Sequence, residues 1–190
     1  MRIIGGKFKG RKILHPINNK TRPLKDLVKE SIFNIIDHSK KIKFKINNID
    51  VLDLFAGTGS FGLECISRGA KKVFFFENHP DAIQILSKNL NNFKEFSNFE
   101  ILKKDCFKFF SSKNSSIYKH DLIFIDPPYK EKKINELLEN ILKKNILSEN
   151  GVVIIHRHKK DEIQITNKLE IFEHRNYGIS KIYFCKKLKI

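Results

Sequence analysis

The stretch DLFAGTGSFG, residues 53–62, decides the fold because a glycine-rich turn separates a strand pattern from a helical one. Gly57, Gly59 and Gly62 follow the spacing G-x-G-x-x-G, which is typical of a turn that approaches a nucleotide-like ligand. Glu77, an acid about 20 residues further on, is placed to hold a ribose diol. The spacing alone also fits a dinucleotide-binding oxidoreductase, or a tight turn that binds nothing.

Strand and helix patterns alternate from residue 50 onward. Apolar, β-branched or aromatic runs predict strands at 50–55, 72–77, 99–105, 121–126 and 151–156. Helical periodicity covers 60–69, 79–93 and 132–144. Two further runs, 168–175 and 178–188, are joined by a turn and predict a terminal antiparallel pair. We therefore expect an α/β fold with a mostly parallel sheet and helices on both faces, whose ligands bind beyond the carboxyl ends of the strands.

The first 45 residues are the most basic part of the chain, with 13 Lys or Arg and three acids. Glycine turns separate two short apolar runs within residues 2–14, which predicts a β-hairpin. An amphipathic helix is predicted within 21–39, and the polar connector 40–48 is the best candidate for a boundary. We expect a basic hairpin-and-helix extension, residues 1–45, followed by an α/β domain, residues 46–190.

The net charge of +16 and the isoelectric point near 9.7 favour a polyanionic partner, nucleic acid before a membrane surface. A solvated Lys-rich surface is the alternative, since most of the basic residues are Lys. No run approaches the roughly 20 apolar residues of a membrane helix, and the N-terminus lacks the apolar core of a signal peptide. Cys65, Cys106 and Cys185 are scattered, which is typical of small core residues in a reducing cytoplasm.

Acidic residues near the ends of predicted strands narrow the class of ligand. Asp53, beside the glycine turn, would repel a pyrophosphate but attract a ligand with ammonium and sulfonium groups. S-adenosylmethionine has both groups and no phosphate. Glu77 would then accept hydrogen bonds from the ribose hydroxyls, and Phe55 is included among the expected cofactor contacts. Asp105 and Cys106 are placed where an adenine would be held, although Asp105 is also suited to cap the helix that follows it.

The segment DPPY consists of Asp126, Pro127, Pro128 and Tyr129, our candidate catalytic residues, and follows a predicted strand. Its prolines remove two backbone donors and leave only acceptors. The Asp126 carboxylate and the Pro127 carbonyl are expected to accept both hydrogens of an exocyclic amine, such as that of guanine or adenine, and so favour its attack on a sulfonium methyl. Tyr129 offers a flat face for a base turned out of its stack. The alternative is a helix N-cap at Asp126 beside a packed Tyr.

In this order, DLFAGTGSFG, FFFE and DPPY resemble a class I S-adenosylmethionine-dependent N-methyltransferase. The opening segments RIIGGKFKGRKI and TRPLKDLVKESIFN are similar to the bacterial 16S ribosomal RNA guanine-N(2) methyltransferases of the RsmD type. The resemblance implies a Rossmann-like, seven-stranded sheet with the last strand antiparallel, and methyl transfer to one guanine of the small ribosomal subunit. We expect a cytoplasmic enzyme that acts as a monomer. RNA would contact the N-terminal hairpin through Arg2, Lys7, Lys9, Arg11, Lys12 and Arg22.

Three positions depart from the pattern of the RsmD type. Leu24 stands where Thr is usual, His79 stands where an acid is common, and HRHKK follows the fifth predicted strand where the family often has an acid. His156 and His158 have the spacing of a metal pair, but no third ligand is evident. We therefore expect no metal, and assign both histidines to a basic rim.

Other functions remain open on the sequence alone. An adenine-N(6) methyltransferase of DNA or RNA shares DPPY, although no separate target-recognition domain fits into 190 residues. A non-catalytic RNA-binding assembly factor would have no need for DPPY. A dinucleotide oxidoreductase would use neither Asp53 nor the proline turn.

Overall fold

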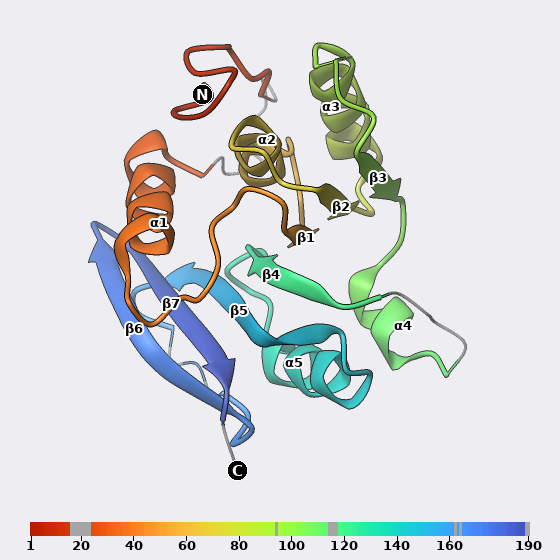
Figure 1. The fold of residues 1–190 in the computed structure, drawn as a ribbon. Helices are drawn as coiled ribbons and strands as arrows, with labels where there is room; N and C mark the ends of the chain where they lie inside the picture. Colours follow the sequence, from red (N-terminus) through yellow and green to blue (C-terminus); the bar gives the residue numbers. More distant parts are fainter. Residues whose placement is uncertain (16–23, 94, 114–117, 162, 164, 189–190) are drawn as a thin grey trace.

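The computed structural model describes residues 1–15, 24–93, 95–113, 118–161, 163 and 165–188. Strands and helices alternate in these ranges as the sequence predicts, and the pattern ends in two adjacent strands (Figure 1). In chain order the elements are α1 Asp26–His38, β1 Asp50–Leu54, α2 Ser60–Ser67, β2 Lys72–Phe76, α3 Pro80–Asn91, β3 Phe99–Leu102, α4 Cys106–Ser111, β4 His120–Ile125, α5 Ile134–Lys143, β5 Leu147–His158, β6 Leu169–Tyr177 and β7 Ser180–Lys187.

All of these strands form one seven-stranded sheet in the order β3-β2-β1-β4-β5-β7-β6. The pairs β1–β2, β1–β4, β2–β3 and β4–β5 are parallel, whereas β7 is antiparallel to both β5 and β6. The sheet is therefore mixed, which corrects the expectation of a mostly parallel one. The cause is local, because the turn at Gly178, with a φ of +58°, joins β6 directly to β7 and forces the two strands to run in opposite directions.

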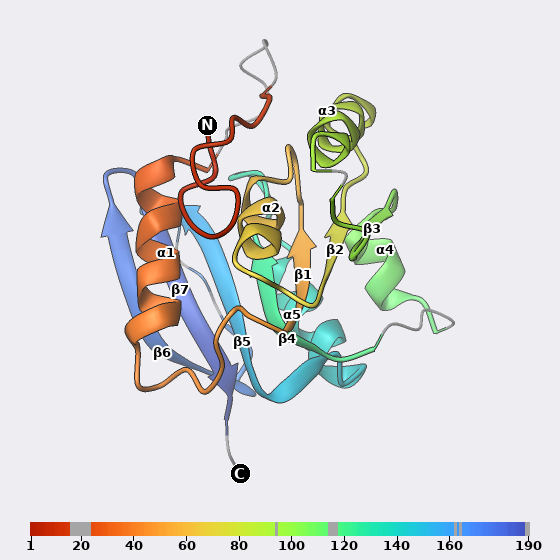
Figure 2. The same ribbon diagram turned by 45° about the horizontal axis from the view of Figure 1, so that its top comes forward.

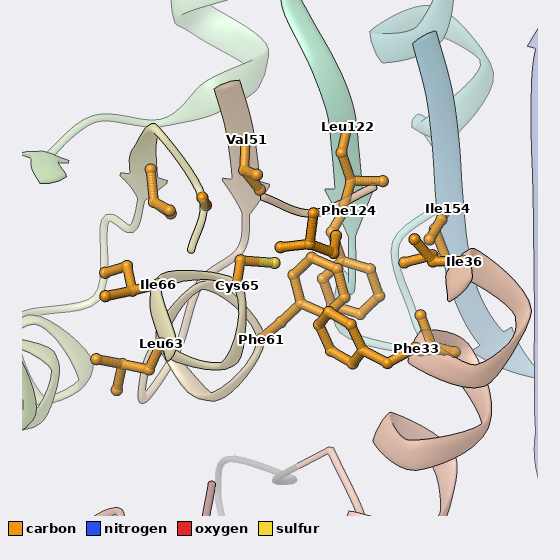
Figure 3. Packing of buried hydrophobic residues seen from close by; sticks show 14 of the residues in the cluster. Phe33, Ile36, Val51, Phe61, Leu63, Cys65, Ile66, Leu122, Phe124 and Ile154 are labelled. Atoms are coloured by element: carbon orange, nitrogen blue, oxygen red, sulfur yellow. The ribbon is translucent and has the colours of Figure 1, made fainter. Parts of the chain in front are cut away.

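Each face of the sheet is covered by helices, as predicted. Side chains of successive strand residues point to opposite faces, so β1 sends Val51 to one apolar cluster and Leu52 to the other. In Figure 1, α1, α2 and α3 cover the first face, and α4 and α5 cover the second. Figure 3 shows the first cluster, in which Phe61 of α2 stacks between Phe33 of α1 and Phe124 of β4, with ring centroids 5.3 and 3.9 Å away. This architecture is Rossmann-like.

The predicted N-terminal β-hairpin forms only in part. Residues 1–15 form a loop with one isolated antiparallel bridge, between Arg2 and Lys12. The Ile3 amide donates to the Arg11 carbonyl at 2.9 Å and the Ile13 amide donates to the Met1 carbonyl at 3.1 Å, so the two arms pair only around this bridge. The amides of Ile4 and Gly5 instead donate to the Glu64 carboxylate of α2, at 2.8 and 2.7 Å. Figure 2 shows this loop, in red, beside α2.

A buried ion pair connects the extension to the rest of the molecule. Lys29 of α1 is fully buried, with its Nζ atom 3.6 Å from a Glu64 carboxylate oxygen and 2.7 Å from the backbone oxygen of Arg2. Apolar residues from both sides of residue 45 belong to one buried cluster. The division into 1–45 and 46–190 stays a prediction. No helix in the described part of the chain is long and apolar enough to cross a bilayer.

Candidate active site

The glycine turn after β1 adopts the backbone conformation that its sequence predicts. Gly57 and Gly59 have φ angles of +56° and +79°, in the left-handed region that favours glycine. A Cβ atom on Gly59 would lie 2.5 Å from Cδ1 of Leu86, a side chain of α3. Gly62 is equally restricted, since a Cβ there would lie 2.2 Å from the Phe75 ring. Gly59 and Gly62 therefore allow close packing of α2 against β2 and α3, whereas at Gly57 the left-handed φ alone favours glycine.

Two carboxylates accept hydrogen bonds from amides of this turn and of the start of α2. The Glu77 Oε2 atom accepts from the Gly57 amide at 2.7 Å, and the Asp53 Oδ2 atom accepts from the Gly62 amide at 3.0 Å. In a dinucleotide-binding turn these donors would face a pyrophosphate. Here the donors are occupied, and their partners are acids that repel phosphate. The geometry argues against the oxidoreductase alternative.

Asp53 is 1% exposed and lies deep at the end of β1. Burial raises the pKa of its carboxyl well above the usual value, and the neighbouring carboxylates of Asp126 and Glu77 raise it further. The Gly62 amide acts in the opposite direction. The carboxylates of Glu77 and Asp126, beyond the ends of β2 and β4, thus produce a negative potential at Asp53, as expected of a site for a cationic ligand. Asp53 itself does not line the neighbouring cavity.

A cavity of about 190 Å³ opens at the carboxyl edge of the sheet, beside β1 and β2. The residues that line it include the predicted cofactor contacts Phe55, Glu77, Asp105 and Cys106, together with Pro128 of the DPPY segment. The sequence reasoning missed five others, namely Phe76, Asn78, Lys104, Phe107 and Glu131. Four of the five directly adjoin a predicted contact in the sequence, so their position near the end of a strand was the signal that could have identified them. The cavity joins the predicted cofactor site to the predicted catalytic segment.

Aromatic rings and a capped helix shape one wall of this cavity. Phe55 has a φ of +60°, a left-handed conformation that is uncommon for a non-glycine residue, and its ring lies 5.7 Å from that of Phe107. Asp105 caps α4, because its Oδ1 atom accepts from the Lys108 amide at 3.1 Å. Asp105 is therefore a helix cap, as the alternative prediction held, and it also lines the cavity. Burial raises the pKa of the Cys106 thiol to about 12, which makes it unreactive.

The DPPY segment does not begin a helix, since α5 starts only at Ile134. The helix-cap alternative for Asp126 is therefore wrong. We call residues 126–131 the catalytic turn. Its Asp126 is 22% exposed in the side chain, and its Oδ1 atom lies 2.8 Å from Nδ1 of His156 on β5. Tyr129 is half-buried, with its ring edge-on to His158 at a centroid distance of 5.1 Å.

Arg157 contacts the backbone of the catalytic turn, and the sequence reasoning missed it. Its guanidinium donates to the carbonyl oxygens of Pro128, Tyr129 and Glu131, at 3.2, 2.9 and 2.9 Å. It is also paired with Asp161 at 3.0 Å. His156 and His158, from the end of the same strand, also contact the catalytic turn. We had expected these two histidines to belong to a basic rim. No group of three or more potential metal ligands occurs among the described residues.

The predicted RNA contacts of the N-terminal loop lie in two places. Lys7 donates its amide to the Ser67 carbonyl at the end of α2, and Arg11 donates to the Asn92 carbonyl beyond α3. Both helices run away from the carboxyl edge of the sheet, so the tip of the loop, with Lys9, lies at the end opposite the catalytic turn. Glu95 pairs with both Lys7 and Arg11. Arg2 and Lys12 bridge each other nearer α1, and the predicted contact Arg22 lies outside the described residues.

Seven exposed lysines surround the carboxyl edge instead, and we call them the lysine rim. They follow β3, β4 and β5, which are the strands that border the cavity and the catalytic turn. None of them forms an ion pair within the described part of the chain. The lysine rim consists of Lys103, Lys104, Lys130, Lys132, Lys133, Lys159 and Lys160.

Comparisons with known proteins agree with this geometry. The family model described as "Conserved hypothetical protein 95" matches residues 1–186. The "Ribosomal RNA small subunit methyltransferase D" of Haemophilus influenzae is 30% identical over 94% of this chain and 90% of its own length. A conserved hypothetical protein of Streptococcus pyogenes is 31% identical, with a TM-score of 0.72 over 84% of this chain and 96% of its own. The crystal structure of SMU.776 complexed with SAH has a TM-score of 0.65 at 19% identity, covering 83% of this chain and 49% of that one.

Proposed function

This chain belongs to the family described as Conserved hypothetical protein 95, and we propose that it transfers a methyl group from S-adenosylmethionine to the N2 amine of a guanine in the 16S ribosomal RNA of the small subunit. The observation that carries the proposal is the junction of two features in one cavity. Phe55 and Glu77, which adjoin or bind the glycine turn, line the same cavity as Pro128 and Glu131 of the catalytic turn. The named relatives are ribosomal RNA methyltransferases, which supports RNA as the substrate.

The residues present fit S-adenosylmethionine. Phe55 and Phe107 provide flat apolar walls for an adenine, and the Glu77 carboxylate lines the same cavity. Glu77 already accepts from the amides of Gly57, Asn78 and His79. A carboxylate offers about four lone-pair sites, so one acceptor site remains for a ribose hydroxyl. The acids Asp53, Glu77 and Asp126 favour a ligand that carries positive charge.

The catalytic turn activates the amine of the base. S-adenosylmethionine supplies a methyl group on a positively charged sulfur. The Asp126 carboxylate and the Pro127 carbonyl, which we call the acceptor clamp, accept the two amine hydrogens and stabilise the positive charge that develops on nitrogen. The amine lone pair forms the new bond to the methyl carbon, and the electrons of the broken carbon–sulfur bond stay on sulfur. The methylated amine then loses one proton to water, so Asp126 is not required as a full base.

RNA is held, in this proposal, by the lysine rim around the cavity. The rim faces the same edge of the sheet as Asp126, whereas the tip of the N-terminal loop lies at the opposite end. A base turned out of its stack would reach Tyr129 while its flanking phosphates contact the lysines. The N-terminal residues Arg2 and Lys12 remain candidates for more distant contacts.

The test is transfer of tritiated methyl groups by the purified protein. Three acceptors are compared, namely small subunits from cells that lack the enzyme, naked 16S ribosomal RNA, and single-stranded DNA. We expect N(2)-methylguanosine in the ribosomal substrates and none in DNA. Label in adenine would instead establish the adenine-N(6) alternative, and binding of S-adenosylmethionine without transfer would favour a non-catalytic assembly factor.

A further inference from the structure

Two residues at the end of β5 contact the catalytic turn, and we propose that both are positioning residues of the acceptor clamp. They are His156 and Arg157, which occupy one oxygen of Asp126 and three backbone carbonyls of the turn. The inference rests on the proposed function, because it explains how the clamp selects and orients a primary exocyclic amine. Neither residue touches the reacting atoms in this proposal.

The sheet itself brings the two segments together. Strands β4 and β5 are parallel neighbours, and Ile125 is the register partner of Ile155. The next residues, Asp126 and His156, therefore lie side by side at the carboxyl end of β4, where β5 continues to His158 and stays paired with β7. One further residue along β5, Arg157 is 6% exposed and lies against the turn that follows Asp126.

The imidazole of His156 fixes the orientation of the Asp126 carboxylate. A carboxylate only accepts hydrogen bonds, so the hydrogen in the 2.8 Å contact belongs to Nδ1 of the histidine. The His156 side chain is 5% exposed, and its Nε2 atom has no partner among the described residues. Its one hydrogen bond is therefore the bond to Asp126. This bond occupies Oδ1 and opposes rotation of the carboxylate, which leaves Oδ2 available to a ligand.

Arg157 fixes the backbone of the catalytic turn, as His156 fixes the Asp126 carboxylate. Its planar guanidinium presents several donors in a fixed geometry, which suits three carbonyls of one turn better than a Lys ammonium would. Because Pro128, Tyr129 and Glu131 already accept from Arg157, their carbonyls are weaker candidates to accept from a base than the Pro127 carbonyl. The Pro127 carbonyl accepts no hydrogen bond from any described residue. Asp161 balances the buried charge of the guanidinium.

Together the two contacts leave Asp126 Oδ2 and the Pro127 carbonyl as the acceptors without a hydrogen bond from the described residues, and we infer that they act as a pair. Two acceptors match the two hydrogens of a primary exocyclic amine. A ribose hydroxyl, with one hydrogen, or a ring nitrogen without hydrogen would leave at least one of them unsatisfied. Since a displacement of about 1 Å in a reacting group can cost 100-fold in rate, loss of either contact should reduce turnover without weakening cofactor binding.

The first experiment compares His156→Leu with His156→Asn in the methyl-transfer assay. Leu removes the donor, and we expect kcat to fall by about 100-fold, while the KM for RNA and the Kd for S-adenosylmethionine stay unchanged. The amide of Asn offers a donor close to the position of Nδ1, and we expect it to restore most of the activity. A control substitution, His174→Asn on the exposed strand β6, should have no effect. Unchanged turnover in His156→Leu, or a folded His156→Asn that stays as inactive as His156→Leu, would overturn the inference.

A second readout does not depend on methyl transfer. Histidine-selective nitrogen-15 NMR of the full chain should show His156 with hydrogen on Nδ1, and Asp126→Leu should abolish the slow exchange of that hydrogen. A fast-exchanging Nδ1 hydrogen in the unsubstituted protein would contradict the pairing. Arg157→Lys should lower kcat while keeping the charge beside Asp161, and equal turnover would exclude the role of the guanidinium. If the unsubstituted protein makes no N(2)-methylguanosine, the proposed function fails, whereas the NMR result still decides the pairing.

Discussion

The Glu77 carboxylate accepts a hydrogen bond from the Gly57 amide at 2.7 Å and also lines the cofactor cavity. One side chain at the end of β2 therefore fixes the turn that follows β1. Its other oxygen accepts from the amides of Asn78 and His79, at the start of α3. In the proposed function, cofactor binding and the shape of the glycine turn therefore depend on the same charge.

Replacing Glu77 by Gln should weaken cofactor binding. The substitution keeps the size of the side chain but removes the charge that strengthens its hydrogen bonds, each of which contributes about 1.5–3 kcal/mol. We expect the Kd for S-adenosylmethionine, measured by calorimetry, to rise by at least tenfold. The matched control is Glu30→Gln on the exposed side of α1. Equal affinities in both variants would exclude Glu77 as a cofactor contact.

The glycine turn should tolerate no side chain at Gly59. Gly59→Ala combines a left-handed φ of +79° with a Cβ atom 2.5 Å from Leu86. Gly10 has a similar φ of +89° but open space around it, so Gly10→Ala reports the backbone cost alone. That cost is about 1–2 kcal/mol, and we expect Gly59→Ala to lose clearly more in urea denaturation. Equal losses would mean that α3 moves freely to accommodate the methyl group.

Acid should destabilise the fold through His120. Burial lowers the pKa of this histidine from 6.5 to about 4, and Asp121 offsets the shift only in part. Between these values the unfolded chain binds a proton that the folded chain refuses, so stability falls as the pH drops from 6.5 to 4. The loss attributable to His120 reaches about 3 kcal/mol.

Urea denaturation at pH 7.5 and pH 4 measures this loss. In His120→Phe the difference in unfolding free energy between the two pH values should shrink by that amount, whereas His38→Gln, at an exposed site, should leave it unchanged. An unchanged pH dependence in His120→Phe would show that the ring is hydrated.

RNA affinity should depend on the lysine rim more than on the tip of the N-terminal loop. Each lost phosphate contact lowers the slope of log affinity against log salt by about 0.7 for a single strand. Substituting Lys130, Lys132 and Lys133 by Ala should therefore flatten the slope by about 2 if all three contact phosphates. Lys7→Ala with Lys9→Ala serves as the control and should change it little. A larger change of the slope in the Lys7→Ala, Lys9→Ala variant would instead indicate that RNA contacts the N-terminal loop.

Local patterns predicted the features that depend on neighbours in sequence. The spacing of apolar residues and the positions of Gly and Pro predict the glycine turn, the strands from β1 to β4 and the position of Asp126 after β4. The predicted hairpin forms only in part because the amides of Ile4 and Gly5 are satisfied by Glu64, about 60 residues away in sequence. The start of β5 was placed at residue 151 because the polar residues 148–150 interrupt its apolar pattern.

The contacts at the end of β5 lay beyond the sequence reasoning for a different reason. His156 and Asp126 become neighbours only once β4 and β5 are paired in register. From the sequence alone, the spacing of His156 and His158 fits either a basic rim or a pair of metal ligands. Strand order determines the partners of such residues, and local sequence patterns do not reveal that order.

The most direct test of the account is nucleoside analysis by mass spectrometry of 16S ribosomal RNA from cells that lack this protein. The cells are complemented with the unsubstituted chain or with Asp126→Asn. The account predicts that the unsubstituted chain restores one N(2)-methylguanosine per small subunit, and that equal amounts of Asp126→Asn, with cofactor affinity intact, restore little or none. Full restoration by Asp126→Asn, or no N(2)-methylguanosine with the unsubstituted chain, would contradict it.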